Sequence, residues 1–163
     1  MEFKNQIEEC KVSDSNNLSP IDVVNLYHYI CEYESFIKHE PGQFDISNKE
    51  LDKFIRHYDI YFDTCAKKNV SKAKKHDHYM LFEQNKNSKA SKNDKAHHLL
   101  RHIRNSIAHG WISKVDGKTE RYNLTDNNGR KDTMWGYIGV KVLYQLITKL
   151  IESKKSESKW QKM

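Results

Sequence analysis

The six positions from Arg104 to His109 read Arg-Asn-Ser-Ile-Ala-His and hold three side chains that can take part in catalysis. An imidazole exchanges protons near neutral pH, and a guanidinium is a permanently charged donor to anions. The surrounding stretch, residues 98–112, has leucines and isoleucines at helical spacing, which places these groups near the end of a helix. They are therefore either part of an active site or the polar end of a helix.

Helical geometry separates the two charged members of this group. Asn105 and His109 are neighbours at i and i+4, on a strip that also holds His98 and His102. Arg104 stands five residues before His109, which places it roughly 140° around the helix, on the other flank of the apolar face. The two side chains meet only if the helix distorts at its end, if the arginine arches over, or if a second copy of the chain contributes.

A purely structural role is the alternative for each of these residues. A histidine next to a glycine that ends a helix is a favourable charge at the negative end of the helix dipole, and Arg101 and Arg104 in the last turns can act in the same way. Asn105 can serve as a cap or form an interhelical hydrogen bond. Spacing alone does not decide between this alternative and catalysis.

Two helices are expected to precede this stretch. Ser19-Pro20-Ile21-Asp22 is typical of a helix start, and the helix should run to about His39. Ser47 and Glu50 match a capping box for a second helix that continues to Cys65. The buried stripe of the first helix is expected to consist of Val23, Val24, Tyr27, Ile30, Cys31 and Ile37.

In the second half of the chain, the spacing of apolar residues changes from a helical to a strand-like pattern. A third helix should start near residues 91–94 and stop at His109-Gly110. Residues 111–124, with a turn at Asp116-Gly117, predict a β-hairpin, and a last helix is expected from about Thr133. The whole is expected to be one domain over residues 1–163 with an all-α fold: a bundle of four to five helices with a small hairpin inserted before the last one. Its core should span about residues 19–152, after a polar lead-in (1–18) and before a frayed basic tail (153–163).

The positive charge is concentrated in one segment. The chain has a net charge of +6, and residues 67–95 hold nine lysines but only three acidic residues. This segment is expected to be a basic loop with a short helix or turn at Tyr79–Phe82. It suits a polyanion such as RNA, or it is only a solvated surface.

The composition argues against a membrane or secreted protein. No stretch approaches the roughly 18 apolar residues of a membrane helix, and the amino terminus lacks a signal pattern. The three cysteines, Cys10, Cys31 and Cys65, stand far apart, so reduced thiols and a cytoplasmic location are expected.

The stretch LRHIRNSIAHG resembles the signature of HEPN domains (higher eukaryotes and prokaryotes nucleotide-binding). With the glycine, hairpin and closing helix that follow, it is similar to the ribonuclease-type members found in bacterial defence and toxin systems. The resemblance covers about residues 19–152 in architecture and 98–126 in sequence. It implies an up-and-down helical bundle that pairs with a second copy, so that Arg104 and His109 of both copies share one cleft.

The resemblance also implies a reaction. RNA would be cleaved without a metal or other cofactor by attack of the ribose 2′-hydroxyl, leaving a 2′,3′-cyclic phosphate, in a toxin or antiphage effector. His109 would be the general base or acid, Arg104 would bind the scissile phosphate, and Asn105 would position one of them. RNA contacts are expected from Arg101, His102, Lys72, Lys74 and Lys75.

The sequence leaves several alternatives open. Many HEPN members supply an acidic or polar residue from an early helix, and the sequence does not distinguish Glu34 from Glu32 in that position. An antitoxin or sensor partner is possible. The alternatives are a HEPN domain that binds RNA or a partner without cutting, a metal-dependent protein using the many histidines, and a pure interaction module.

Overall fold

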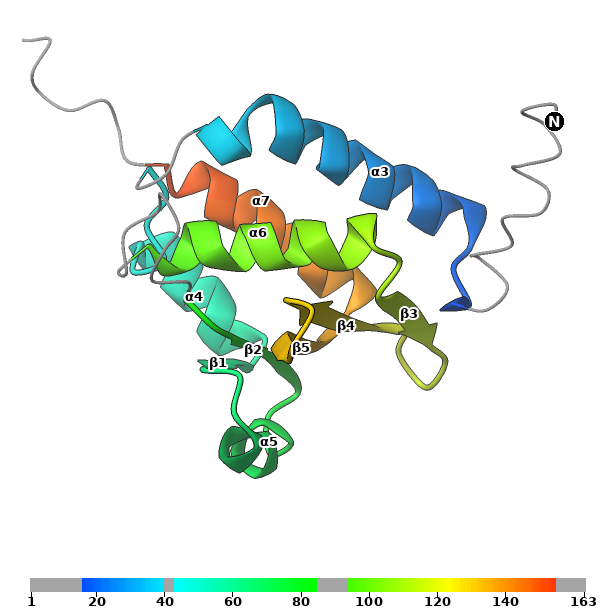
Figure 1. The fold of residues 1–163 in the computed structure, drawn as a ribbon. Helices are drawn as coiled ribbons and strands as arrows, with labels where there is room; N and C mark the ends of the chain where they lie inside the picture. The colour runs from blue at the N-terminus through cyan, green and yellow to red at the C-terminus, as the bar shows by residue number, and fades with distance from the viewer. Residues whose placement is uncertain (1–15, 40–42, 85–93, 155–163) are drawn as a thin grey trace, which may run out of the picture.

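The computed structural model describes residues 16–39, 43–84 and 94–154 (Figure 1). The lead-in up to residue 15, the part of the basic segment at 85–93 and the tail from 155 lie outside the described residues. The helices are α3 (Pro20–Ser35), the 3-10 helix η1 (Ile37–His39), α4 (Lys49–His57), α5 (Lys67–Ala73), α6 (Lys95–Ala108) and α7 (Val140–Glu152). The strands are β1 (Ile60–Asp63), β2 (His78–Phe82), β3 (Ile112–Val115), β4 (Arg121–Asn127) and β5 (Asp132–Gly139).

The prediction of an all-α fold is wrong, because five strands form one sheet in the order β1-β2-β5-β4-β3. β1 and β2 are parallel, and the other neighbours are antiparallel. The expected hairpin is confirmed as β3 and β4. The segment expected to be a short helix or turn, Tyr79–Phe82, lies in β2, where it pairs with β5.

The last helix was expected from about Thr133, but it begins at Val140, because residues 132–139 form β5. The close packing of β5 on β2 explains the glycine in its middle. Met80 stands opposite Gly136, and a Cβ atom on that glycine would lie 2.7 Å from the Met80 sulfur. A side chain at this position would therefore require the buried Met80 side chain to move.

Helices α3 and α6 lie over the sheet as two layers, with α6 between α3 and β4 (Figure 1). The hydroxyl of Ser106 fixes α6 to the sheet by donating to the Thr125 carbonyl at 2.8 Å. The predicted limits of α6 are confirmed, since Asp94 caps its start and Gly110 ends it with a φ of 70°. The centre of the core is formed by side chains from α6, β4, β5 and α7 that are 0–1% exposed: Leu99, Leu100, Ile103, Leu124, Ile138, Leu143, Leu146 and Leu150.

Helix α3 begins as predicted, with the Ser19 side chain and Asp22 forming a capping box. The expected buried stripe is wrong for most of its residues. Val24 and Tyr27 are 62% and 67% exposed, and the residues that α3 buries include Leu26, Tyr29 and Tyr33. The Tyr29 hydroxyl donates to the Leu100 carbonyl of α6 at 2.6 Å, which helps to set this rotation of the helix.

Buried polar groups anchor the start of α3 to the sheet. Asp22 accepts from Lys114 of β3 at 2.8 Å and from the Tyr122 hydroxyl of β4 at a shorter distance. Although burial opposes ionisation, the hydrogen bonds from Lys114 and Tyr122 lower the pKa of Asp22 to about 2. The first residues of α3 are thus fixed by an ionised carboxylate.

The second helix, α4, is shorter than expected. Asn48 caps it through hydrogen bonds to the Glu50 and Leu51 amides, so the predicted cap at Ser47 is one residue too early. The helix ends at His57, and Asp59 with a φ of 51° turns the chain into β1. Phe62 and Cys65, expected on this helix, therefore lie in and after a strand.

Candidate active site

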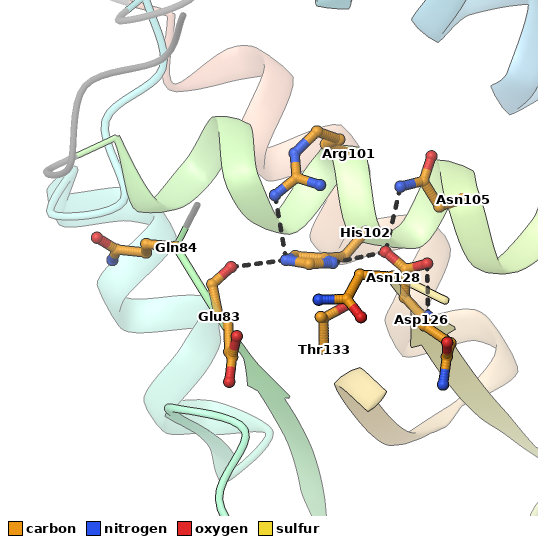
Figure 2. A pocket seen from close by; sticks show the side chains of 9 residues that line it. Glu83, Gln84, Arg101, His102, Asn105, Asp126, Asn128 and Thr133 are labelled. Atoms are coloured by element: carbon orange, nitrogen blue, oxygen red, sulfur yellow. Dashed lines mark hydrogen bonds and ion pairs between the residues drawn. The ribbon is translucent and has the colours of Figure 1, made fainter. Parts of the chain in front are cut away.

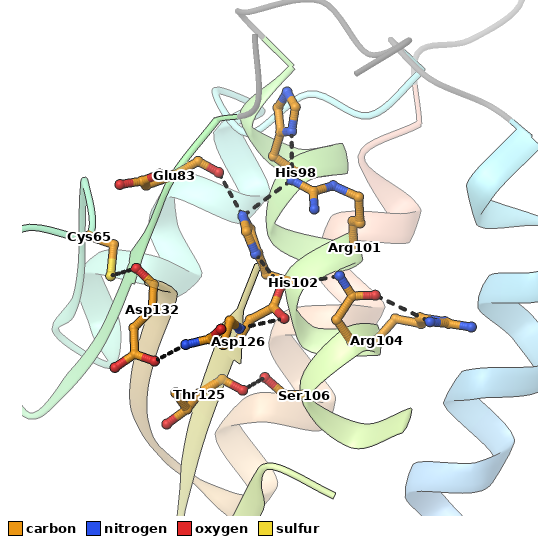
Figure 3. Close-up of polar contacts among 12 residues, drawn as sticks. Cys65, Glu83, His98, Arg101, His102, Arg104, Ser106, Thr125, Asp126 and Asp132 are labelled. Carbon is orange, nitrogen blue, oxygen red and sulfur yellow. Dashed lines mark hydrogen bonds and ion pairs between the residues drawn. The ribbon is translucent and has the colours of Figure 1, made fainter. Parts of the chain in front are cut away.

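Arg104 is held by a carboxylate from α3 and by its own neighbour on α6. Figure 3 shows its side chain directed toward α3. Its Nε and Nη2 lie 2.9 and 2.8 Å from Oε1 of Glu34, and its Nη1 donates to Oδ1 of Asn105 at 3.2 Å. Lys38 also binds the Glu34 carboxylate, at 2.6 Å. The hydrogen bond from Lys38 and the charge of Arg104 keep the pKa of Glu34 below its ordinary value. The structure thus distinguishes Glu34, whose carboxylate contacts the motif arginine, from Glu32.

Asn105 connects Arg104 to a second polar cluster. Its Oδ1 accepts from Arg104, while its Nδ2 donates to the Asp126 carboxylate of β4 at 3.1 Å. Although burial opposes ionisation, hydrogen bonds from His102 and Asn105 hold the pKa of Asp126 below its ordinary value. Both ends of the Asn105 amide are therefore occupied, which fixes its orientation.

His102 is a buried member of the same cluster. Its Nδ1 lies 2.7 Å from the Asp126 carboxylate, and its Nε2 lies 2.6 Å from the Glu83 carbonyl. Both ring nitrogens of His102 are therefore in contact with acceptor oxygens. The ring is 2% exposed. The geometry therefore makes His102 a structural link between α6 and the sheet.

His109 lies at the end of α6 in different surroundings. It is the residue that follows the last helical turn, its side chain is exposed, and its ring stacks on Trp111 with 4.7 Å between the ring centroids. Arg104, in contrast, is directed toward α3. Within one protomer the two motif residues have separate neighbours, as the helical geometry predicts.

A polar cavity of about 390 Å³ opens beside the motif (Figure 2). It brings together three of the predicted site residues, Arg101, His102 and Asn105, and it does not include Arg104 or His109. Its wall also holds residues that follow β2 and the residues around the turn between β4 and β5. The complete lining is Glu83, Gln84, Arg101, His102, Asn105, Asp126, Asn127, Asn128 and Thr133.

Arg101 has an unusual environment in this cavity. Its Nη2 lies 3.4 Å from Nδ1 of His98 and 3.3 Å from Nε2 of His102, and its buried Nε has no hydrogen-bond partner among the described residues. Burial lowers the pKa of this guanidinium from its ordinary value. An arginine nevertheless stays charged in proteins, so a cation faces the cavity.

The predicted lysine contacts lie on another part of the molecule. Lys72 is on α5, and Lys74 and Lys75 follow it; all three are exposed. Helix α5 packs against β1 and β2, away from α6 (Figure 1). The structure therefore does not bring these lysines together with the motif.

Among the described residues, no group of three or more histidine, cysteine, aspartate or glutamate side chains is arranged to hold a metal ion. Cys31 is exposed and Cys65 is buried, both as free thiols. None of the described helices combines the length and the apolar character that crossing a bilayer requires.

Sequence reasoning identified the α6 residues but missed their partners. Glu34 and Asp126 stand 70 and 21 residues away from the α6 groups that they bind. The sequence offered Glu34 only as one of two choices, and it did not single out Asp126 as a site residue. No local signal could have selected them, because their positions depend on how α3 and β4 pack against α6.

Comparison with known proteins places this chain in a family. Searches of curated proteins and of solved structures found no match to the chain. The family model described as HEPN pEK499 p136 matches residues 11–159, which include every element described above and the Arg104–His109 motif. Because the match extends over nearly the whole sequence, the chain belongs to this HEPN family.

Proposed function

We propose that the protein is a metal-independent endoribonuclease, acting as a toxin or antiphage effector, whose active site is formed by Arg104, Asn105 and His109. The proposal is supported by the contacts that orient Arg104 and by the exposure of the motif side chains. Arg104 is oriented by Glu34 and Asn105 while its side chain stays 29% exposed, and His109 is exposed at the end of the same helix. A residue needed only to finish a helix would not require such support.

The chemistry follows from the groups available. His109 takes the proton from the ribose 2′-hydroxyl, and the 2′-oxygen attacks the adjacent phosphorus. The bond from phosphorus to the 5′-oxygen breaks, and that oxygen receives a proton from a second acid, for which His109 of a second copy is suited. The products are a 2′,3′-cyclic phosphate and a 5′-hydroxyl.

Arg104 stabilises the charge that develops on the phosphate oxygens. A guanidinium has five N–H donors, and its contacts with Glu34 and Asn105 leave donors free for a phosphate. The Glu34 carboxylate and the Asn105 amide hold the planar group in one orientation before substrate arrives, which is the arrangement that favours transition-state binding.

A second copy of the chain would bring the separated residues together. Helix α3 also carries large apolar side chains on its outer side, next to polar residues such as Asn25 and His28, and clustered exposed apolar side chains are typical of an interaction surface. Its outer side exposes Ile21, Val24 and Tyr27. A mostly apolar hollow of about 430 Å³ lies between α3 and Ile107 and Ala108 at the end of α6. These surfaces flank His109, so a dimer formed through them would place two motifs near one another.

The test compares motif variants with matched controls. Arg104→Ala and His109→Ala should each reduce RNA cleavage by at least about 100-fold, because a positioned acid or base and a charge-stabilising donor are each worth that much. Arg56→Ala and His57→Ala are the controls, since these residues lie in the last turn of α4 and His57, like His109, has an aromatic neighbour, Tyr58. Cleavage by either motif variant at the wild-type rate would refute the proposal.

A further inference from the structure

The cavity beside α6 is lined by a guanidinium, Arg101, that has no direct ion pair among the described residues. Glu83 is paired with Lys131 at 2.9 Å, and Asp126 is paired with His102 at 2.7 Å. Arg101 is the remaining charged residue of the lining, and in the described part of the chain no carboxylate lies within ion-pair distance of it. The Arg101 guanidinium thus faces the cavity without a carboxylate in direct contact.

A half-buried guanidinium without an acidic partner is costly, and an anionic ligand would offset that cost. Its Nε has no hydrogen-bond partner among the described residues, and its contacts with His98 and His102 are long, at 3.4 and 3.3 Å. Arginine is suited to phosphate because its planar fork donates two parallel hydrogen bonds. The chemistry of Arg101 therefore indicates a phosphate group.

The opposite wall of the cavity carries amides. Oδ1 of Asn128 accepts from the amides of Arg130 and Lys131, so its Nδ2 is the end that remains available (Figure 2). Gln84 contributes a second amide, from the segment that follows β2. Amide groups can donate and accept at the polar edge of a nucleobase. A volume of about 390 Å³ is within the range of small-molecule sites.

The position of the cavity relates it to the motif. Arg101 and Arg104 are three residues apart on α6, so their side chains start from neighbouring positions. Asn105 lines the cavity and also accepts a hydrogen bond from Arg104. One polar surface therefore runs from Arg104 to the cavity.

We infer that this cavity binds one nucleotide of the RNA chain, next to the phosphate held by Arg104, with Arg101 on its phosphate and Gln84 and Asn128 on its base. The inference rests on the proposed ribonuclease function, which it deepens by adding a base preference beside the cleaved bond. His102 and Asp126 form the fixed floor of the site and contribute no proton to the reaction.

The binding test uses single nucleotides and needs no cleavage. Calorimetry with the four nucleoside monophosphates should show saturable binding to the full chain and a preference for one base. Arg101→Gln and Asn128→Asp should each lower the affinity for the preferred nucleotide by about tenfold or more. Each substitution removes a hydrogen bond to a charged or buried polar group. Asn128→Asp keeps the oxygen that caps the turn, so it tests the site even if Arg101→Gln unfolds the protein. Asn123→Asp, which adds the same charge at an exposed position of β4, should leave binding unchanged.

Competition identifies the source of the nucleotide. An oligoribonucleotide made uncleavable by 2′-deoxy substitution should displace the bound monophosphate, and Asn128→Asp should alter the base preference at the cleaved bond. Failure of the oligonucleotide to compete would overturn the inference. Equal affinities of the Asn128→Asp variant and the wild type for the preferred nucleotide would overturn it as well. Inorganic phosphate binding as tightly as any nucleotide would also overturn it. A protein that binds the nucleotide and competing RNA but never cleaves would instead refute only the ribonuclease proposal.

Discussion

At the scale of single residues, Asn105 joins the two polar clusters of α6. It accepts from Arg104 on one side and donates to Asp126 on the other. Arg104 depends in addition on Glu34, whose carboxylate is shared with Lys38. The orientation of the motif arginine is thus set by Glu34 and Asn105.

Removal of Glu34 tests this support. Glu34→Ala should lower kcat/KM for RNA cleavage by up to about 100-fold, because a misplaced catalytic group loses rate even when it is present. The thermal unfolding midpoint should hardly change, since the pair is partly exposed. Glu32→Ala, two residues away on the same helix, is the control. Equal effects of the two variants on cleavage would show that Arg104 does not need its carboxylate partner.

The His102–Asp126 pair should matter for stability. The two side chains are 2% and 4% exposed, so Asp126→Asn should lower the free energy of unfolding by about 3–5 kcal/mol, as the loss of one partner of a buried pair does. Because the pKa of Asp126 is depressed in the fold, this stabilisation is present above its ordinary value of 3.8 and declines as the pH falls below that value. Urea unfolding at several pH values measures both effects.

The variant His109→Ala is the control and should change the free energy of unfolding by less than about 0.5 kcal/mol. A comparable loss of stability in Asp126→Asn and His109→Ala would contradict the distinction between a structural and an exposed histidine.

At the scale of elements, the sequence predicted the helices with clear local signals. The starts of α3 and α6 and the end of α6 were correct because Ser19, Asp94 and Gly110 act on their immediate neighbours. The strands β1, β2 and β5 were missed, since a short apolar run fits a helix or a strand equally well. Whether such a run becomes a helix or a strand depends on its pairing partner, and β2 pairs with β5, more than 50 residues away.

The candidate site shows the same limit. Arg104, Asn105 and His109 could be named from their order in the sequence, because one helix carries all three. The cavity could not be predicted from the sequence, because its walls come from α6, the segment after β2 and the turn after β4. The rotation of α3 was wrong for a related reason: Leu26 and Tyr29 on one side and Val24 and Tyr27 on the other are all apolar enough for a core.

The outer side of α3 gives a prediction for assembly. Val24 is 62% exposed in the protomer, so Val24→Glu should leave folding intact but place a charge in the proposed dimer interface. Analytical ultracentrifugation should show the wild type as a dimer and the variant as a monomer, with cleavage lost in parallel. Lys53→Glu, an exposed substitution on α4, should keep the dimer. A wild type that is monomeric and active would contradict the composite site.

At the scale of the whole molecule, the positive residues proposed to contact RNA lie in two places. Exposed lysines lie on and after α5, beyond β1 and β2, while Arg101 and Arg104 lie on α6 (Figure 1). An RNA that reaches both would have to extend around the sheet, or it would contact the lysines of a second copy. Either arrangement makes the lysines a contact for the RNA backbone, without base specificity.

Salt dependence measures the binding of RNA by these lysines. Replacing Lys72, Lys74 and Lys75 together by glutamine should weaken RNA binding for all sequences alike. The slope of log K against log salt should fall by about 0.7 for each phosphate of a single strand that the variant no longer neutralises. Lys53→Gln on α4 is the control. An unchanged slope in the triple variant would mean that these lysines are only a solvated surface.

Incubation of the purified protein with RNA in excess EDTA, followed by analysis of the product ends, tests the proposed function most directly. We predict cleavage that is undiminished by the chelator, products that carry 2′,3′-cyclic phosphate and 5′-hydroxyl ends, and no cleavage by His109→Ala under the same conditions. RNA that stays intact, cleavage that requires a divalent metal, or 5′-phosphate products would contradict a ribonuclease site built on Arg104 and His109.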